Sequence, residues 1–200
     1  MQQTTAPLMT QTGEQFLAEG RAAITAAQAD VAAFKALAKD ASPTQAADAL
    51  DQIDRTLNTV SGRIHLYSQV HPNGDMREAA EVLEREISAF STELSLDREM
   101  FDRVAAVNLD GVDDGQVLRL FEHSLRDFRR SGVDLDEDSR DKVGALKNEL
   151  VEIGQEFDRN IIGGGREFII SEGPAGLAGL PQDYIDAHPA DENGEVRIST

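Results

Sequence analysis

The sequence predicts a mainly α-helical protein, in which long antiparallel helices form a bundle of hairpins and a small β element follows near the carboxy terminus. Apolar residues recur at intervals of three and four through most of the first 160 positions, which is the spacing of one helix face. The interruptions between these stretches carry residues that cap helices. After Gly163, Gly164 and Gly165 the pattern changes to short apolar runs between Gly, Pro, Asn and Asp, which is typical of strands and turns.

The first two predicted helices form a hairpin. The first covers about residues 14–39 and places Leu17, Ile24 and Val31 at seven-residue intervals. Ser42 and Pro43 then indicate a new helix start, because serine accepts a bond from a first-turn N–H and proline has no N–H to lose there. The apolar face of this second helix alternates steps of four and three and consists of Ala46, Leu50, Ile53, Leu57, Val60, Ile64 and Tyr67.

A third helix is expected after residues 71–75. Pro72 restricts the residue before it, and the Asn-Gly pair that follows favours a turn, so the second helix has to end here. The next face contains Met76, Ala80, Leu83, Ile87, Phe90 and Leu94. Because the same spacing continues through Phe101 and Val104, the pattern predicts a single helix of about 45 Å, with a kink near Ser95 as the alternative.

Two further helices complete the helical part. The fourth is shorter and follows Asp110 and Gly111; its face contains Val117, Phe121, Leu125 and Phe128. Arg126, Arg129 and Arg130 lie near its expected end, where cations stabilise the negative pole of the helix, and Gly132 ends it. The fifth helix begins near Asp134 or Asp136. Its face is the most regular in the chain and consists of Val143, Leu146, Leu150, Ile153, Phe157 and Ile161.

These patterns divide the chain into three parts. Residues 1–12 are expected to be a disordered amino terminus, and residues 13–162 form a helical domain of about five helices. Residues 163–200 form short strands, near 166–170 and 195–199, with loops that are expected to lead into a further part of the polypeptide. Two strands alone are marginally stable in water, so a longer polypeptide is expected to cover them.

Composition excludes several classes of protein. Asp and Glu number 37 against 19 Lys and Arg, and a net charge of −18 repels the phosphates of nucleic acids. No apolar run reaches the roughly 18 residues needed to cross a membrane, and residues 1–12 lack the basic and apolar parts of a signal peptide. Cysteine is absent, which is compatible with a reducing compartment. The sequence therefore predicts a soluble cytoplasmic protein with no nucleic-acid or membrane partner.

No complete catalytic or metal site is predicted within these residues. The four histidines, His65, His71, His123 and His188, include no pair four residues apart on one helix, which is the common arrangement of two zinc ligands. There is also no cysteine nucleophile and no Gly-x-Ser-x-Gly turn. We therefore assign no catalytic, cofactor-binding or metal-binding residue to the chain.

Two other features have a functional and a structural interpretation. The glycines at 163–165 are common in phosphate-binding loops, but here they follow a helix, whose end has the wrong sign to attract an anion. Arg126, Arg129 and Arg130 could bind a peptide carboxylate through paired hydrogen bonds. A helix stop and a cluster of charges at a helix end are the favoured interpretations.

Four sequence blocks resemble one family in order and spacing. They are LYSQVHPNGDMREAAE at 66–81, LRDFRRSGVDL at 125–135, LVEIGQEFDRNI at 150–161 and LAGLPQDYI at 177–185. Together they resemble the amino-terminal region of the thimet oligopeptidase and oligopeptidase A family of zinc metallopeptidases. The resemblance covers the chain from about Asp51 to Thr200. The glycines at 163–165 depart from it, because more polar residues are expected there.

This resemblance implies a fold in which long helices form one side of a deep channel. The zinc ion and its His-Glu-x-x-His helix are then expected in a later part of the polypeptide, outside the given residues. In such enzymes a metal-bound water attacks the peptide carbonyl, and the narrow channel admits short peptides and excludes folded proteins. None of the matching positions holds a catalytic or zinc-binding role in the family, so none is transferred to this chain.

The preferred hypothesis is therefore the amino-terminal, channel-forming part of a zinc-dependent oligopeptidase, which acts on short peptides only in the full-length enzyme. The segment is expected to restrict substrate access, to support the catalytic half and to be inactive alone. The alternative is a non-catalytic helical protein-interaction module, since the apolar faces of its helices can pack on a partner protein as well as on each other. The sequence does not specify the oligomeric state.

Overall fold

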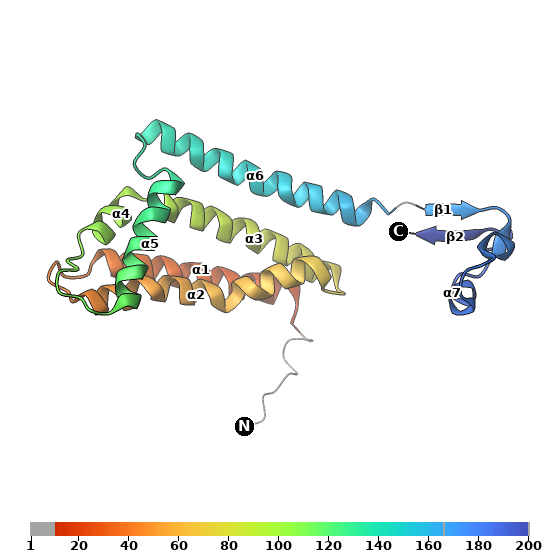
Figure 1. Cartoon of the computed structure of the whole chain (residues 1–200), viewed down its shortest axis with the longest axis horizontal. Helices are drawn as coiled ribbons and strands as arrows, with labels where there is room; N and C mark the ends of the chain where they lie inside the picture. Colours follow the sequence, from red (N-terminus) through yellow and green to blue (C-terminus); the bar gives the residue numbers. More distant parts are fainter. Residues whose placement is uncertain (1–10, 166, 200) are drawn as a thin grey trace, which may run out of the picture. The chain divides into compact units, whose positions relative to one another are not determined.

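A computed structural model of the chain describes residues 11–165 and 167–199, and it confirms the predicted class, a mainly helical protein with a small two-stranded sheet near the carboxy terminus (Figure 1). Most of the amino-terminal segment predicted to be disordered lies outside the described residues. No helix in the described ranges is long and apolar enough to cross a membrane. The elements in chain order are α1 (Gly13–Lys35), α2 (Pro43–Val70), α3 (Gly74–Ser95), α4 (Arg98–Ala105), α5 (Gly115–Ser131), α6 (Glu137–Gly163), β1 (Glu167–Ile170), a 3-10 turn η1 (Gly173–Leu177), α7 (Gln182–Ala187) and β2 (Val196–Ser199).

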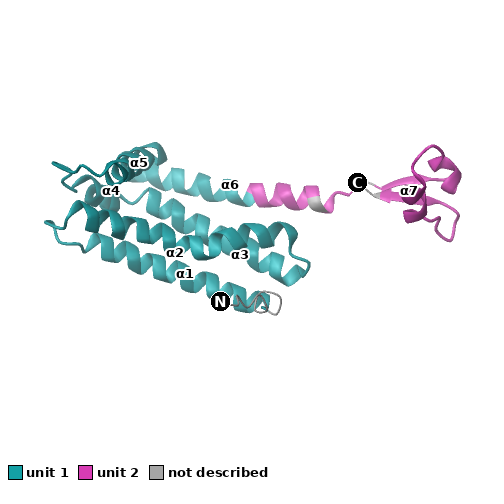
Figure 2. Cartoon of the chain, turned by 60° about the horizontal axis from the view of Figure 1, so that its bottom comes forward, with its two compact units in different colours: residues 1–152 teal, residues 153–200 magenta. Residues whose placement is uncertain are grey.

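The chain divides into two compact units, residues 1–152 and residues 153–200 (Figure 2). The first unit contains α1 to α5 and the beginning of α6. The second contains the rest of α6, the two strands, η1 and α7. This division falls within α6, whereas the change in sequence pattern falls at the glycines that end this helix.

In the first unit, α1, α2 and α3 pack side by side (Figure 1). Local signals set the start of each helix. Thr12 and Gln15 form a capping box at α1, in which the Gln15 N–H donates to Thr12 Oγ1 over 3.2 Å and the Gln15 side chain accepts from the Thr12 N–H over 3.0 Å. Ser42 and Gln45 repeat this arrangement at α2, with Pro43 in the first turn, as predicted.

The apolar faces of these three helices meet in a core at one end of the bundle. It contains Phe16 of α1, Val60, Ile64 and Tyr67 of α2, and Met76, Ala79, Ala80 and Leu83 of α3, all buried. Burial of each large apolar side chain contributes about 1.5–3 kcal/mol. Gly20 allows α1 to approach α3 closely, because a Cβ at this position would lie 2.3 Å from a Leu83 methyl group. The spacing of α1 and α3 thus depends on this glycine.

The single long third helix that the pattern favoured is wrong: there are two helices, and the break lies where the alternative, a kink near Ser95, was expected. The α3 helix ends at Ser95, and Asp97 starts α4 by accepting the N–H of Met100 on its carboxylate over 2.9 Å. The apolar spacing continues across this break, which is why the pattern alone suggested one helix. Asp97 interrupts the helix, because its side chain accepts an N–H that would donate to a backbone carbonyl in a continuous helix.

The break at Asp97 lets α4 and α5 build a second core. The buried side chains of Phe34, Ile53, Met100, Val104, Val117 and Phe121 meet there. The α5 helix ends as predicted at Gly132, which has a φ of 101° and donates its N–H to the Arg129 carbonyl. The first helix ends at Lys35, earlier than the predicted position near residue 39.

The second unit contains the predicted strands, paired antiparallel with Phe168 opposite Ile198 and Ile170 opposite Val196. Gly173 has a φ of 63°, and a Cβ there would lie 2.5 Å from the Gly194 carbonyl oxygen, so only glycine fits this close approach. The short helix α7 was not predicted. A helix of six residues contains too few apolar positions for a period to be recognised.

Candidate functional site

The most prominent surface feature of the chain lies on α6. Asp136 caps the start of this helix. Its carboxylate accepts one hydrogen bond from the Ser139 N–H over 2.9 Å and another from the Ser139 hydroxyl over 2.8 Å. These bonds hold the pKa of Asp136 below its ordinary value. Glu137 and Asp138 add negative charge in the first turn, where it is favourable. The helix ends at Gly163, as predicted from the run of glycines.

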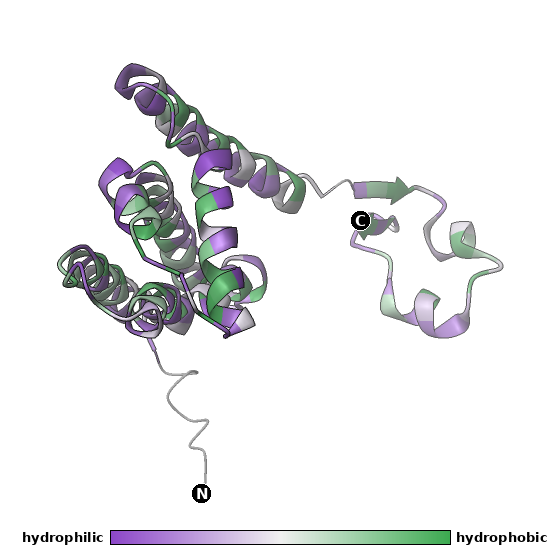
Figure 3. Cartoon of the chain, turned by 60° about the vertical axis from the view of Figure 1, so that its left-hand side comes forward, coloured by the Kyte–Doolittle hydropathy of each residue, from purple (hydrophilic) through white to green (hydrophobic). Residues whose placement is uncertain are grey.

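One face of α6 carries large apolar side chains that are not covered by the described residues of their own unit, Leu146 and Leu150 in the first unit and Ile153, Phe157 and Ile161 in the second. Figure 3 shows hydrophobic residues recurring along the helix between hydrophilic ones. The exposed fractions of these side chains lie between 53% and 67%. We call this surface the α6 apolar face; it consists of Leu146, Leu150, Ile153, Phe157 and Ile161. A single exposed leucine is ordinary, whereas five large apolar residues along one helix face indicate a contact surface.

The second unit exposes apolar residues as well. Phe168 and Ile169 on β1 are exposed, although successive strand residues point to opposite faces of a sheet. Both faces of the sheet are therefore open at these positions. The connection before β2 is held by Asp191, which accepts the N–H groups of Glu195 and Asn193 and an Arg197 N–H; these bonds lower the pKa of Asp191. The hairpin is thus locally well formed, and η1 packs against β1 and Val196 is buried, while Phe168 and Ile169 remain exposed among the described residues.

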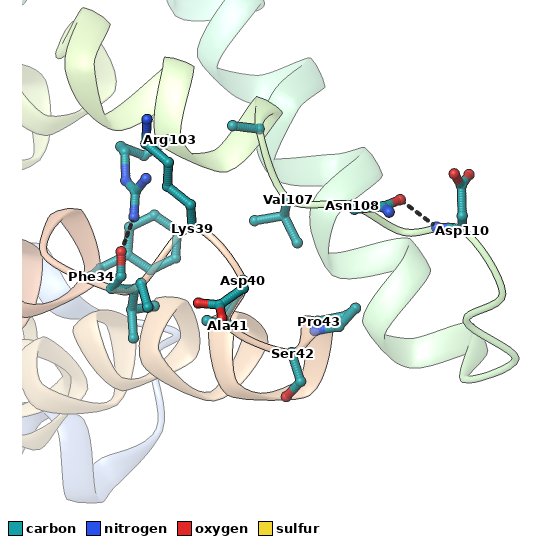
Figure 4. A pocket seen from close by; sticks show the side chains of 14 residues that line it. Phe34, Lys39, Asp40, Ala41, Ser42, Pro43, Arg103, Val107, Asn108 and Asp110 are labelled. Atoms are coloured by element: carbon teal, nitrogen blue, oxygen red, sulfur yellow. Dashed lines mark hydrogen bonds between the residues drawn. The ribbon is translucent and has the colours of Figure 1, made fainter.

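A pocket of about 570 Å³ lies between the α1–α2 loop and the segment that follows α4 (Figure 4). Arg103 contributes a half-buried guanidinium that donates to the Leu37 carbonyl oxygen, while its Nε is buried and has no hydrogen-bond partner among the described residues. On the other side of the pocket, the Asn108 side-chain oxygen accepts the Asp110 N–H over 2.9 Å, which forms a local turn. Charges of both signs line this pocket, including Lys39, Arg103, Asp40 and Asp110. It therefore selects neither anions nor cations.

The histidines considered in the sequence lie apart from one another. His65 is exposed on α2, and its Nδ1 is 3.9 Å from the Glu84 carboxylate. His71 follows α2 and stacks edge-on against Tyr67. His123 is exposed on α5, and His188 stacks on Tyr184 beyond α7. Within the described ranges no three His, Asp or Glu residues converge as metal ligands. These residues do not make a zinc site.

The arginines near the end of α5 do not form a joint carboxylate clamp. Arg126 binds Asp127 through two hydrogen bonds of 2.8 and 3.2 Å, and these bonds lower the pKa of Asp127. Arg129 lies over the Phe101 ring instead, 5.4 Å from its centre, and its Nε is 3.9 Å from Asp134. These two arginines therefore serve different local contacts, and the structural interpretation of the cluster fits them better.

Comparison with known proteins indicates the protein family to which this chain is similar. No family model matches the chain. Its sequence nevertheless aligns with peptidases, and the alignments confirm the resemblance to the thimet oligopeptidase and oligopeptidase A family, in its amino-terminal region. The chain is thus related to a peptide-hydrolysing family.

Two relatives define this similarity. Oligopeptidase A of Haemophilus influenzae is 30% identical over 142 residues, which are 68% of this chain and 20% of that protein. The mitochondrial intermediate peptidase of Arabidopsis thaliana is 27% identical over 114 residues, which are 56% of this chain and 16% of that protein. The matched part of the chain therefore spans no more than a fifth of the length of either relative.

The sequence pattern located the α6 apolar face but not its exposure. Periodic apolar residues predict that a helix has a contact face, and they do not tell whether that face is covered. The pocket beside Arg103 was missed for a different reason. Its walls come from two loops that are far apart in the sequence, and no local spacing connects them.

Proposed function

We propose that this chain is the amino-terminal, channel-forming part of a zinc-dependent endopeptidase that hydrolyses short peptides. In this proposal the helices of the first unit form a wall that limits access to a catalytic part elsewhere in the polypeptide. The zinc ion and the groups that activate water belong to that other part. The similarity to two peptidases supports the reaction class, and the length of these relatives leaves room for a separate catalytic part.

The observation that carries this proposal is the α6 apolar face. These five large side chains are 53–67% exposed, so covering what remains exposed would gain roughly half to two thirds of the about 1.5–3 kcal/mol that full burial of such a side chain contributes. A second copy of the chain is a poor occupant, because a net charge of −18 on each copy opposes self-association. Packing against the catalytic part covers the face without bringing two such charges together.

The activity test compares the 200-residue chain with the polypeptide encoded by the complete gene. Both are assayed on short quenched-fluorescent peptides, with added zinc and with a chelator. We expect no cleavage by the 200-residue chain and chelator-sensitive cleavage by the complete product. Chelator-sensitive cleavage by the 200-residue chain alone would refute the proposal that the catalytic groups lie in another part of the polypeptide. A complete product without peptidase activity would refute the proposed class.

The docking role of α6 has its own test. Leu150→Glu and Phe157→Glu place charges on the apolar face, and Asn148→Glu places the same charge at an exposed position off that face. In the complete product we expect the first two variants to lose stability and activity, whereas the control retains both. In the 200-residue chain all three should unfold like the parent. Normal activity of both face variants in the complete product would contradict the docking role.

The same exposed face also favours the second candidate, a helical module that binds another protein without catalysis. Sedimentation of the complete gene product distinguishes the two functions when it is combined with the activity assay. A discrete complex with a separate protein, formed by a product that cleaves no peptide and broken by Phe157→Glu, would favour the module. Peptidase activity of a product that remains a monomer favours the enzyme.

A further inference from the structure

A second pocket, of about 290 Å³, lies within the first unit where α2, α3, α4 and α5 meet. Its apolar lining includes Ile53 and Leu57 of α2, Met100 of α4 and Phe128 of α5. The α5 helix crosses the bundle at this end (Figure 1), and residues of α2, α3 and α5 line the pocket together. The pocket thus offers an apolar surface for a side chain.

The charged residues that line this pocket all have one sign, although cations of Lys147 and Arg126 lie beside it. Asp54 and Asp127 belong to its lining, and no Lys, Arg or His does. The negative charge of Asp127 is already compensated by Arg126, which donates two hydrogen bonds to its carboxylate. Asp54, in contrast, has no hydrogen bond or ion pair to any of the described residues. Asp54 is exposed as a residue although its carboxyl is partly buried against the pocket, so it is available to a ligand that enters from solvent.

The remaining polar groups fit an ammonium ion. Serine hydroxyls accept hydrogen bonds as well as donate them, and Ser91, Ser95, Ser124 and Ser131 line the pocket. One ammonium group of the chain already contacts this lining, since Lys147 Nζ lies 3.3 Å from Ser95 Oγ. The strongly acidic character of the whole chain also raises the local concentration of cations.

We propose that this pocket binds the side chain of a lysine residue in a peptide. The four methylene groups of that lysine lie on the apolar floor, and its ammonium group donates hydrogen bonds to the Asp54 carboxylate and to nearby serine hydroxyls. An apolar stem with a charged end is the chemistry that such a pocket matches. The site is built from the first unit alone, so this inference does not depend on the proposed peptidase function.

The experiment is an NMR titration of the isotopically labelled 200-residue chain. The probe is lysine blocked as its N-acetyl and N-methylamide derivative, and the matched probe is norleucine blocked in the same way, which lacks the ammonium group. Ionic strength is held constant. We expect saturable chemical-shift changes at pocket residues with the lysine probe. The norleucine probe should bind with an affinity about tenfold lower, or lower still, because a hydrogen bond to a charged group is lost.

Two variants locate the contact. Asp54→Asn removes the charge with almost no change in shape, and should weaken lysine binding about tenfold or more. Asp51→Asn removes a neighbouring carboxylate that pairs with Arg55 and does not line the pocket, and should leave binding nearly unchanged. Spectra of both variants show whether the fold is retained. Absence of saturable shifts, equal binding of the two probes, or equal losses in the two variants would each overturn the proposal.

Discussion

The α2 and α6 helices carry nearly the same sequence pattern but have opposite surroundings. Both place large apolar residues at alternating steps of three and four. On α2, Ile53, Leu57, Val60 and Ile64 are at most 8% exposed. On α6, Leu150, Ile153, Phe157 and Ile161 are at least 53% exposed. Periodicity therefore specifies that a helix has an apolar face, and the partner of that face is specified elsewhere.

The first unit supplies the partners of its own helices, and α6 has none of comparable extent. On α1, α2 and α3 every element contributes side chains to a shared core. No residue of α6 belongs to the hydrophobic core clusters of the described residues, and Lys147 links this helix to Ser95 by a hydrogen bond of 3.3 Å. This contrast in packing predicts measurable differences in the free energy of unfolding and in local opening between the two regions.

Truncation of one leucine in each region should give the largest difference. Leu83→Ala removes a fully buried side chain and leaves a cavity, so we expect a loss of about 2–5 kcal/mol in the free energy of unfolding. Leu150→Ala removes an exposed side chain and should change this free energy by less than about 0.5 kcal/mol. Urea unfolding followed by circular dichroism measures both. Similar losses for the two variants would mean that α6 is covered in solution.

Hydrogen exchange should separate the two helices without any mutation. Amides of residues 53–64 on α2 open only when the core opens, whereas those of residues 153–161 on α6 can open locally. We expect exchange on α6 to be faster by on the order of a hundredfold or more. Mass spectrometry of peptides from the exchanged chain measures this ratio. Equal protection of the two segments would contradict the difference in packing.

Removal of a helix cap should have a smaller effect. Ser42→Ala deletes the hydroxyl that accepts the Gln45 N–H, and we expect a loss of about 1 kcal/mol. Ser61→Ala is the matched control within the same helix, because its hydroxyl donates to the Leu57 carbonyl, which the helix already uses. The control should be close to neutral in the same urea experiment. A neutral Ser42→Ala would show that the cap is dispensable.

The smallest effect concerns Asp54. Burial raises the pKa of this carboxyl, and the nearby charge of Asp51 raises it further. The folded state therefore favours the protonated form, and its stability falls as pH rises from the ordinary Asp54 pKa through the raised one. Asp54→Asn should stabilise the chain slightly at neutral pH, and the gain should vanish below about pH 4. A gain that persists at low pH would point to another cause.

Most of the helical fold followed from the sequence because helix starts and ends are encoded locally. Ser42 with Pro43 and Gly132 each act within one turn of the chain, and the structure confirms both. The break between Ser95 and Asp97 was predicted only as the alternative, a kink near Ser95, because the apolar period continues through it. The period describes which residues face the core, and it does not register a side chain that competes for one backbone N–H.

The candidate surfaces depended on information that the sequence lacks. The positions of the α6 apolar face were predicted, but its exposure depends on elements that are distant in the sequence. The pocket at Asp54 gathers residues from four helices, and its acidic character becomes visible only when they are brought together. A carboxylate among many others in an acidic chain gives no local signal of a special role.

The capping residues have a consequence for the speed of folding. Each of the helices α1 to α6 begins with a side chain that binds a nearby backbone N–H: Thr12, Ser42, Asn73, Asp97, Asp114 and Asp136. These bonds form between residues two or three positions apart, so no distant segment has to arrive first. Helical proteins dominated by such short-range contacts fold in microseconds to milliseconds. Each of these helices can therefore begin to form as soon as its own first turn has been synthesised, before the helices that it packs against are complete.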